Sequence, residues 1–412
     1  MPNVNPIVIQ QGSTPEPTTG DYLVRFIDFD GTILKTQYVD SGNDATAPDA
    51  GTHTNLTFNS WNNTFTNITR NTDVGAMYDV TDGKTYLFVS PTTVTGLQPT
   101  IYLTKADTQI LTINWGDGTS QTSSASGNIS ILKTAPYASV TEYEIDIECD
   151  GDYSFENSYA FANGNYQKII TKFYAGANCT TLGLYSFWYM FSLRHIMLHK
   201  DVVTSTVWML SAYSLKALII PTVNTGITGL GAEAYSLQVC VIPTGVTSLG
   251  ANTFRNTWSL ISIVLPTSTA SLQGGLFEKS AAKNIEMPTI VTAVAIIGTA
   301  AFIDNRGLEE LAIPSGITNT GTNSFLRINT LRYIDIPVGV TTIGSGSFYQ
   351  ALSLIDVVCN PTTPPTMANI NAFQGINVAC KIYVPDASVT AYKTATNWTV
   401  YADYIYPLSE RP

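Results

Sequence analysis

The residues in this sequence that could most plausibly do chemistry are its three histidines. His195 and His199 are four residues apart, a spacing at which two imidazoles on one helical face can share a metal ion. The repeated sequence around them predicts a strand instead, in which four residues span about 13 Å, whereas zinc ligands lie about 2 Å from the metal. We therefore expect His195 and His199 to be separate, outward-facing polar residues, and His53 to lie in a turn-rich segment.

Two aspartates near the N-terminus form a second candidate. The segment 28–32, Asp-Phe-Asp-Gly-Thr, resembles the first motif of haloacid-dehalogenase-type phosphatases. The resemblance implies that Asp28 is a nucleophile and Asp30 an acid/base. That motif needs a buried parallel strand before it and a helix after it. Here the β-type run 33–39 follows, and no partner Lys or Asp–Asp pair lies in a helix–strand context downstream. We expect a strand–turn–strand and no phosphatase.

No other pattern predicts catalysis. The sequence lacks the G-x-S-x-G, H-E-x-x-H and P-loop motifs. The cysteines are far apart and form no C-x-x-C pair, so we expect buried thiols and neither zinc nor a disulfide framework. They are Cys149, Cys179, Cys240, Cys359 and Cys380. The sequence therefore predicts no catalytic, cofactor-binding or metal-binding residues, no cofactor, and a protein that is not an enzyme.

The composition fits a β-rich protein. Hydrophobic residues make up 44% of the 412 residues and charged residues only 12%, and Thr, Asn, Ser and Tyr fill the difference. The net charge of -11 would repel a phosphate backbone, so we expect no nucleic-acid partner. No apolar run of 18 residues occurs, so we expect no membrane insertion. The first residues lack the basic and apolar regions of a signal peptide.

A repeat of about 22–25 residues organises the second half of the chain. Leucine marks each unit, an apolar-Pro pair follows it, and a phenylalanine closes the cycle. The leucines are Leu193, Leu215, Leu237, Leu260, Leu308, Leu331 and Leu354, and the phenylalanines are Phe254, Phe277, Phe302, Phe325, Phe348 and Phe373. One unit cannot bury its apolar face alone, so the units must stack around a shared interior. We expect Leu and Ile of a short strand to point inward and Phe to fill the opposite wall.

The phrase I-P-x-G-V-T-x-I-G-x-x-x-F, as in residues 336–348, is repeated in register. It resembles the BspA-type leucine-rich repeats of bacterial, protist and phage surface proteins, over roughly residues 190–375. The resemblance implies a leucine-rich-repeat solenoid over residues 151–412. Residues 376–412 would form its terminal cap, and residues 151–190 would cap or begin the other end.

Three smaller units precede the solenoid. Residues 1–20 are Pro-rich and predict an extended anchoring arm, with Val4, Ile7, Val8 and Ile9 as its contact residues. Residues 21–80, with the strand–turn–strand described above followed by Phe58 and Trp61, resemble the repeat domain of internalin B. That resemblance implies a β-grasp-like module with both aromatic residues in its core.

Residues 81–150 are the third unit. Trp115-Gly-Asp-Gly-Thr119, followed by an alternating strand from Tyr137 to Ile147, resembles the PKD family of Ig-like sandwiches. The resemblance implies that Trp115 lies in the core. We expect Asp117 to be a turn residue that accepts backbone N–H bonds, not a metal ligand.

Together these parts predict a mainly β, multidomain protein: a β-grasp-like module, an Ig-like β-sandwich and a leucine-rich-repeat solenoid. The lack of an export signal favours a phage virion protein, either a capsid decoration or head fibre or a tail-associated fibre. Its arm would bind other virion proteins, and its repeats a host surface glycan or protein. The alternative is a bacterial cell-surface adhesin; homo-oligomerisation is left open. Outward aromatic residues of the repeats are candidates for the ligand surface: Tyr213, Trp258, Tyr333 and Tyr349.

Overall fold

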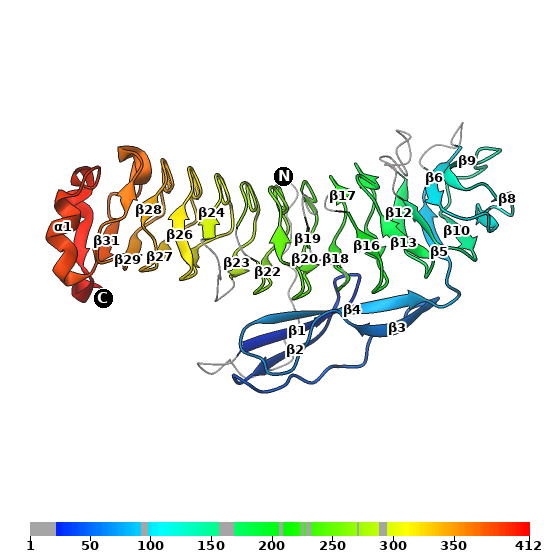
Figure 1. The fold of residues 1–412 in the computed structure, drawn as a ribbon, viewed down its shortest axis with the longest axis horizontal. Coiled ribbons are helices and arrows are strands. Elements are labelled where there is room, and N and C mark those ends of the chain that lie inside the picture. The colour runs from blue at the N-terminus through cyan, green and yellow to red at the C-terminus, as the bar shows by residue number, and fades with distance from the viewer. Residues whose placement is uncertain are drawn as a thin grey trace.

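The computed structural model is an elongated stack of coils with a small sheet docked along one side (Figure 1). It describes residues 22–91, 98–155, 169–205, 209–222, 224, 226–227, 232–269, 272–287 and 295–412. Within these ranges strands predominate, and the helical segments are short and lie near the C-terminus. The arm residues Val4, Ile7, Val8 and Ile9 fall outside the described residues.

The N-terminal sheet has four strands in the order β2-β1-β4-β3. They are β1 (Tyr22–Ile27), β2 (Ile33–Val39), β3 (Leu56–Trp61) and β4 (Thr72–Val80). A hairpin joins β1 to β2 through Gly31, whose φ of 94° is a left-handed conformation that favours glycine. Strands β1 and β4 are parallel. The expected strand–turn–strand is confirmed, and no helix follows the two aspartates.

The core of this sheet corrects one expectation. Val24, Phe26 and Val74 are fully buried, and Trp61 packs against Phe26 with ring centroids 5.1 Å apart. Phe58, however, is 37% exposed. It lies on β3, the edge strand, where its side chain is covered on one side only. The prediction that Phe58 is a core residue is therefore wrong.

The described residues of 85–91 and 98–149 form two sheets that face each other and continue directly into the first coils of the stack. One sheet has the order β15-β12-β5-β10-β7-β8, and the other has the order β16-β13-β11-β6-β9. The strands before the stack are β5 (Thr85–Val89), β6 (Thr100–Lys105), β7 (Leu111–Asn114), β8 (Ser120–Ser123), β9 (Gly127–Leu132) and β10 (Tyr143–Cys149). These two sheets cover the N-terminal end of the solenoid interior.

The turn between β7 and β8 confirms two expectations. Trp115 is fully buried. The Asp117 carboxylate accepts hydrogen bonds from the backbone N–H and the hydroxyl of Thr119, as a turn residue does. The same carboxylate also pairs with the buried Lys133 ammonium at 2.6 Å, a contact that the sequence did not predict.

Most coils of the stack contribute one short strand to each of two walls, and the paired strands within a wall are parallel. The first wall contains β12 (Ile170–Tyr174), β15 (His195–Met197), β18 (Ala217–Ile219), β20 (Val239–Val241), β22 (Ser262–Val264), β23 (Asn284–Glu286), β25 (Glu310–Ala312), β27 (Tyr333–Ile336), β29 (Asp356–Cys359), β31 (Lys381–Val384) and β32 (Ile405–Pro407). The second contains β11 (Tyr153–Phe155), β13 (Cys179–Leu182), β16 (Val203–Thr204), β19 (Gly226–Ile227), β21 (Ser248–Leu249), β24 (Ala295–Ile297), β26 (Ile317–Thr320), β28 (Thr342–Ile343) and β30 (Thr366–Met367). The third side consists of turns, with β14 (Phe187–Trp188) and β17 (Met209–Leu210) in its first coils.

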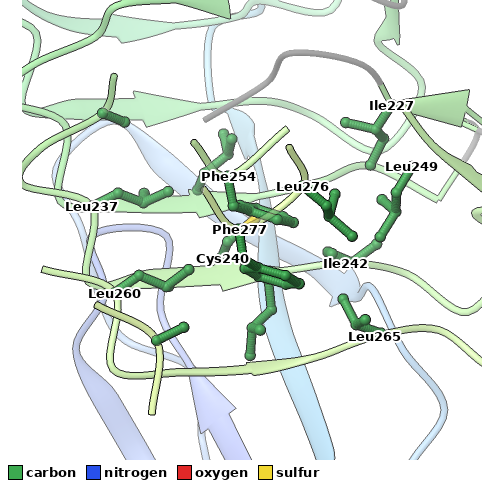
Figure 2. Packing of buried hydrophobic residues seen from close by; sticks show 14 of the residues in the cluster. Ile227, Leu237, Cys240, Ile242, Leu249, Phe254, Leu260, Leu265, Leu276 and Phe277 are labelled. Atoms are coloured by element: carbon green, nitrogen blue, oxygen red, sulfur yellow. The ribbon is translucent and has the colours of Figure 1, made fainter. Parts of the chain in front are cut away.

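The repeated phenylalanines lie on the third side and point into the interior, as expected. Six rings stack in line, with centroids 4.8–5.5 Å apart between successive coils. All six are fully buried: Phe254, Phe277, Phe302, Phe325, Phe348 and Phe373. Figure 2 shows Phe254 above Phe277, with Leu237 and Leu260 of successive coils beside them. We call this row the inner ladder.

The C-terminal segment closes the stack. Its helical pieces are η2 (Ile370–Phe373), η3 (Asp386–Ser388), α1 (Val389–Thr394), η4 (Thr399–Tyr404) and η5 (Leu408–Glu410). Trp398 is fully buried and lies 5.8 Å from Phe373, the last ring of the inner ladder. This segment shields apolar side chains that would otherwise end the stack in water, as a terminal cap would.

The N-terminal sheet docks onto the first wall (Figure 1). Outward residues of three successive coils on that wall are apolar and buried beneath it: Met197, Ile219 and Val241. Amide side chains of the loop after β3 fix the register. Asn62 donates to the Ile220 carbonyl at 3.1 Å, and Asn63 donates to the Ile242 carbonyl at 3.0 Å. The sheet therefore covers the outer face of the first half of this wall. It does not cover the strands from β25 onward.

Candidate ligand-binding surface

A second row of aromatic residues runs along the outside of the first coils. Its members share one position of the repeat, four residues before the first residue of the next first-wall strand, where the chain leaves the third side. We call them the outer ladder: Phe191, Tyr213, Tyr235 and Trp258. The first three are partly buried, and Trp258 is 47% exposed.

The rings of the outer ladder contact one another from coil to coil. Tyr213 and Tyr235 stack with centroids 4.6 Å apart and an interplanar angle of 21°, and Tyr235 and Trp258 stack at 4.3 Å and 15°. Phe191 meets Tyr213 edge-on at 4.9 Å. These separations are close to the 4.7–4.9 Å between neighbouring strands of a sheet. The backbone of the solenoid thus sets the rings at stacking distance.

Hydroxyl groups beside the outer ladder tie each coil to the one before. The Ser214 hydroxyl donates to the Phe191 carbonyl at 2.6 Å, and the Ser259 hydroxyl donates to the Tyr235 carbonyl at 2.8 Å. Ser353 continues the pattern with the Asn329 carbonyl. The first two bonds hold the backbone of Phe191 and of Tyr235, which helps to order the surface before a ligand binds and so lowers the entropy lost on binding.

The outer ladder ends at Ala281. The Ala281 N–H donates to the Thr257 carbonyl and the Arg306 N–H to the Ser280 carbonyl, so residues 258, 281 and 306 are equivalent in successive coils. The small side chain of Ala281 leaves one face of the Trp258 indole without a stacking ring. The Arg306 guanidinium reaches across this gap and lies 5.4 Å from the ring centroid.

The structure brings together two of the four aromatic residues proposed from the sequence. Tyr213 and Trp258 belong to the outer ladder. Tyr333 lies on the first wall in β27, under the Arg411 guanidinium at 5.0 Å, and Tyr349 follows Phe348 on the third side. The sequence reading missed Tyr235. Its signal was present, because Tyr235 is 22 residues after Tyr213 and 23 before Trp258.

The Tyr213 hydroxyl of the outer ladder remains a donor. Partial burial raises the pKa of Tyr213, and the neighbouring Tyr235 and Glu233 raise it further. A phenol with a raised pKa stays protonated at neutral pH, so it can donate to a ligand oxygen as well as offer its ring. The surface therefore combines apolar ring area with polar edges, the composition found at protein binding hot spots.

The aspartate and histidine candidates have structural roles. The Asp28 carboxylate is 2% exposed and lies 2.8 Å from His53 Nε2, and its other oxygen accepts from the Phe29 N–H. His195 lies in β15, as predicted. His199 was expected to face outward, and this is wrong: it is 5% exposed, and its Nε2 lies 3.1 Å from the Cys179 carbonyl oxygen.

The cysteines offer no activated nucleophile in the described part of the chain. All five are buried and unpaired, as expected. Burial raises the pKa of four of them to about 12: Cys179, Cys240, Cys359 and Cys380. In the same ranges no group of three or more potential ligands is placed to hold a metal ion. Nor do those ranges contain a helix with the length and apolarity needed to cross a bilayer.

Comparison with known families gives one match that covers most of the chain. The profile described as BspA type Leucine rich repeat region matches in six copies, over residues 143–236, 228–356 and 277–394. These ranges include the outer ladder, the inner ladder and part of the C-terminal cap. No significant match was found among curated proteins.

The solved structures that this chain resembles are repeat proteins with low sequence identity to it. A leucine-rich repeat protein from Bacteroides ovatus ATCC 8483 is 19% identical with a TM-score of 0.39, over 54% of this chain and 65% of that one, so this chain spans less than two thirds of its length. A leucine rich cell surface protein from Faecalibacterium prausnitzii A2-165 is 16% identical with a TM-score of 0.26, over 58% and 83%. The pneumococcal vaccine antigen PcpA is 13% identical with a TM-score of 0.33, over 58% and 66%.

Proposed function

The chain belongs to the BspA-type leucine-rich repeat family, and on that premise we propose that it is a non-enzymatic surface adhesin that binds its ligand through the outer ladder. The observation that carries this proposal is the unbroken row of rings from Phe191 to Trp258, one per coil, ending in an indole that is 47% exposed. The outer row lies at the surface and not in the shared interior, so core packing alone does not account for it.

A saccharide or a protein surface fits such a row. The C–H face of a pyranose packs flat on an aromatic ring, while its hydroxyls bond to polar groups at the ring edges. Tyr and Trp also dominate the binding energy of protein interfaces, because they present large rigid areas at low entropic cost. We therefore propose a host surface glycan or protein as the ligand, in line with the expectation from the sequence.

The location of the adhesin is a separate question. It stays a prediction that the protein lies on a phage virion, as a capsid decoration, head fibre or tail-associated fibre bound to other virion proteins. The alternative, a bacterial cell surface, fits the family membership. Mass spectrometry of purified virions and of washed cell envelopes separates the two: finding the protein only in envelopes contradicts the virion location.

The two N-terminal modules are proposed to be spacers that orient the solenoid. The order β2-β1-β4-β3 with a parallel central pair supports a β-grasp-like assignment for residues 21–80. The paired sheets with Trp115 between them support a PKD/Ig-like assignment for residues 81–150. The docking of the first module on Met197, Ile219 and Val241 supports a spacer that is fixed to the solenoid instead of swinging free.

A binding comparison between variants tests the adhesin role. Full-length protein is applied to host cells and to a glycan array, alongside Trp258→Ala and the control Tyr349→Ala, a partly buried tyrosine outside the outer ladder. We expect Trp258→Ala to lose most binding and Tyr349→Ala to keep it. Equal binding by all three proteins, or no binding by the wild type, would contradict the proposal.

A further inference from the structure

We propose that the pocket at the end of the outer ladder is a subsite for an anionic sugar unit, one that carries a carboxylate or a sulfate group. This inference deepens the proposed function and rests on it, because the outer ladder would hold the neighbouring sugars. The pocket is open and has a volume of about 300 Å³, and it lies against the coils around residues 279, 305, 306, 327 and 329.

Arg306 links the pocket to the ladder. Its guanidinium lies over the indole of Trp258 and its side chain also lines the pocket. Arg306 is exposed, so it can leave the ring without breaking packed contacts. A sugar that stacks on the freed indole face would place its anionic substituent within reach of the guanidinium. Ala281 makes this possible, because a larger residue there would cover the indole permanently.

The charge of the pocket favours an anion. Three cations line it (Lys279, Arg306 and Arg327) against one carboxylate, Asp304, so the lining carries 3 − 1 = +2 in a chain of net charge -11. Arg327 pairs with Asp304 through two bonds of 2.8 Å, and Lys279 lies 3.3 Å from Glu278. In the described part of the chain Arg306 forms no direct ion pair, although the Asp304 carboxylate that pairs with Arg327 also interacts with it electrostatically.

The backbone aims these charges outward. Lys279, Asp304 and Arg327 occupy one position of three successive coils, and each has φ of 55°. The left-handed residue ends the turn after the inner ladder and turns its side chain away from the interior. The pocket charges are thus fixed in a row parallel to the outer ladder, as an extended saccharide requires.

A buried donor without an acceptor is the second independent sign of a ligand. Asn305 lines the pocket and is 2% exposed. Its Oδ1 accepts from the Gly307 and Leu308 N–H groups at 3.0 and 2.9 Å, which fixes the orientation of the amide. Its Nδ2 has no hydrogen-bond partner, a state that is rare for a buried polar group. Because Nδ2 is itself buried, a ligand oxygen would become its acceptor only after a shift of the side chains at this wall.

The two larger hollows lack this preference. One, of about 410 Å³, is lined by one cation, Arg332, and one carboxylate, Glu309, so its lining has no net charge. The groove of about 450 Å³ between the N-terminal sheet and the solenoid is lined by two cations and three carboxylates, a net charge of −1. The cations are Arg25 and Lys283, and the carboxylates are Asp73, Glu286 and Glu310. Arg25 and Asp73 already form a bidentate pair at 2.7 Å. An anionic ligand would therefore select the pocket at the end of the ladder.

Calorimetric titration of the full chain tests the subsite. The probes are oligogalacturonate, which carries carboxylates, a carrageenan oligosaccharide, which carries sulfates only, and a neutral galacto-oligosaccharide. Arg306→Gln removes the available charge. Asn305→Asp keeps the acceptor of the two backbone N–H groups but replaces the orphan donor with an oxygen. Arg332→Gln, an exposed arginine of the next coil, controls for the general loss of one positive charge.

We expect Arg306→Gln and Asn305→Asp each to weaken binding of an anionic probe about tenfold or more, as for loss of a charge-assisted hydrogen bond. Binding of the neutral probe should change less than about twofold, and Arg332→Gln should resemble the wild type. The anionic probe that binds identifies carboxylate or sulfate as the recognised group. Equal losses in Arg306→Gln and Arg332→Gln would overturn the subsite. So would neutral-probe binding that depends on Trp258 with no preference for either anionic probe, a result that leaves the adhesin role standing.

Discussion

The inner and outer ladders are two rows of aromatic residues made by the same repeat with different consequences. The inner ladder runs from Phe254 to Phe373 with every ring fully buried. The outer ladder runs from Phe191 to Trp258 and grows more exposed toward its end. Both have ring separations close to the spacing of neighbouring strands, so the coil spacing alone produces a stack. Whether a stack is core or contact surface depends on which way its repeat position faces.

The two ladders also divide the solenoid. They overlap in a single coil, the one that holds both Phe254 and Trp258. Two coils before it, the inner position holds Met209, and in the coil of Phe191 it holds Phe187, whose ring is also fully buried. In the coils after it, the outer position holds Ala281 and then Arg306. The two ladders thus share only one coil, which makes them separable by mutation.

The largest effect is expected from breaking the inner ladder. Phe302→Ala removes a fully buried ring from between Phe277 and Phe325 and leaves a cavity. We expect a loss of about 3–5 kcal/mol in the free energy of unfolding, measured by chemical denaturation. Phe302→Leu, which refills part of the space, should lose much less. A loss under about 1 kcal/mol for Phe302→Ala would mean that the ring is not a core element.

The next effect comes from the spacing of the coils at the end of the outer ladder. A Cβ added at Gly307 would lie 1.9 Å from the Ala281 carbonyl oxygen, so Gly307→Ala forces the two coils apart. We expect a loss of about 1–3 kcal/mol, as for overpacking, seen as a lower denaturation midpoint. Gly226→Ala is the control, because an added Cβ there meets nothing within 4 Å. Equal midpoints for the two variants would contradict the close approach.

Breaking the outer ladder should cost less stability than breaking the inner one. Trp258→Ala removes a half-exposed ring and its stack with Tyr235, so we expect a loss of about 1–2 kcal/mol. Ligand binding should nevertheless fall further than in any inner-ladder variant that still folds. Thermal unfolding and cell binding on the same samples check both parts. A stability loss as large as that of Phe302→Ala would remove the distinction between the ladders.

Extending the outer ladder by one ring should sharpen the comparison. Ala281→Tyr places a ring on the open face of Trp258 and displaces Arg306. We expect a gain of about 0.5–1 kcal/mol from the new stack, together with weaker binding of an anionic saccharide and unchanged binding of a neutral one. Ala281→Ser, which adds polarity but no ring, is the control. A decrease in melting temperature would show that the gap is needed for packing.

The smallest effect concerns the ion pair between coils beside the pocket. The hydrogen bonds from Arg327 lower the pKa of Asp304. A lowered folded-state pKa contributes stability above the unfolded value of about 4, and this contribution is lost as pH falls through the folded value. Because the pair is partly exposed, we expect Asp304→Asn to lose about 0.2–1 kcal/mol at pH 7 and nothing at about pH 2. Denaturation at several pH values checks this, with exposed Asp150→Asn as control. A difference that persists at about pH 2 would contradict the ion-pair explanation.

Much of the fold could be predicted from the sequence, because equivalent positions of successive repeats occupy equivalent environments. Each Leu and Phe at a fixed interval must face the same way in every coil, so the spacing predicted the inner ladder and the cap without any distant contact. The turn at Gly31 and the buried Trp115 were equally local. For the outer ladder the sequence supplied Tyr213 and Trp258 as outward residues, and their phase in the repeat contained Tyr235 as well.

The burial and exposure that only the tertiary structure determined depend on contacts between segments that are far apart in the chain. Met197, Ile219 and Val241 are outward residues of strands, and only the arrival of the N-terminal sheet, more than 100 residues earlier in sequence, buries them. Likewise the burial of His199 and the exposure of Phe58 depend on what lies beside them in space. A local pattern specifies which face of a strand or turn a residue occupies, but whether that face meets water or another part of the chain is settled by packing alone.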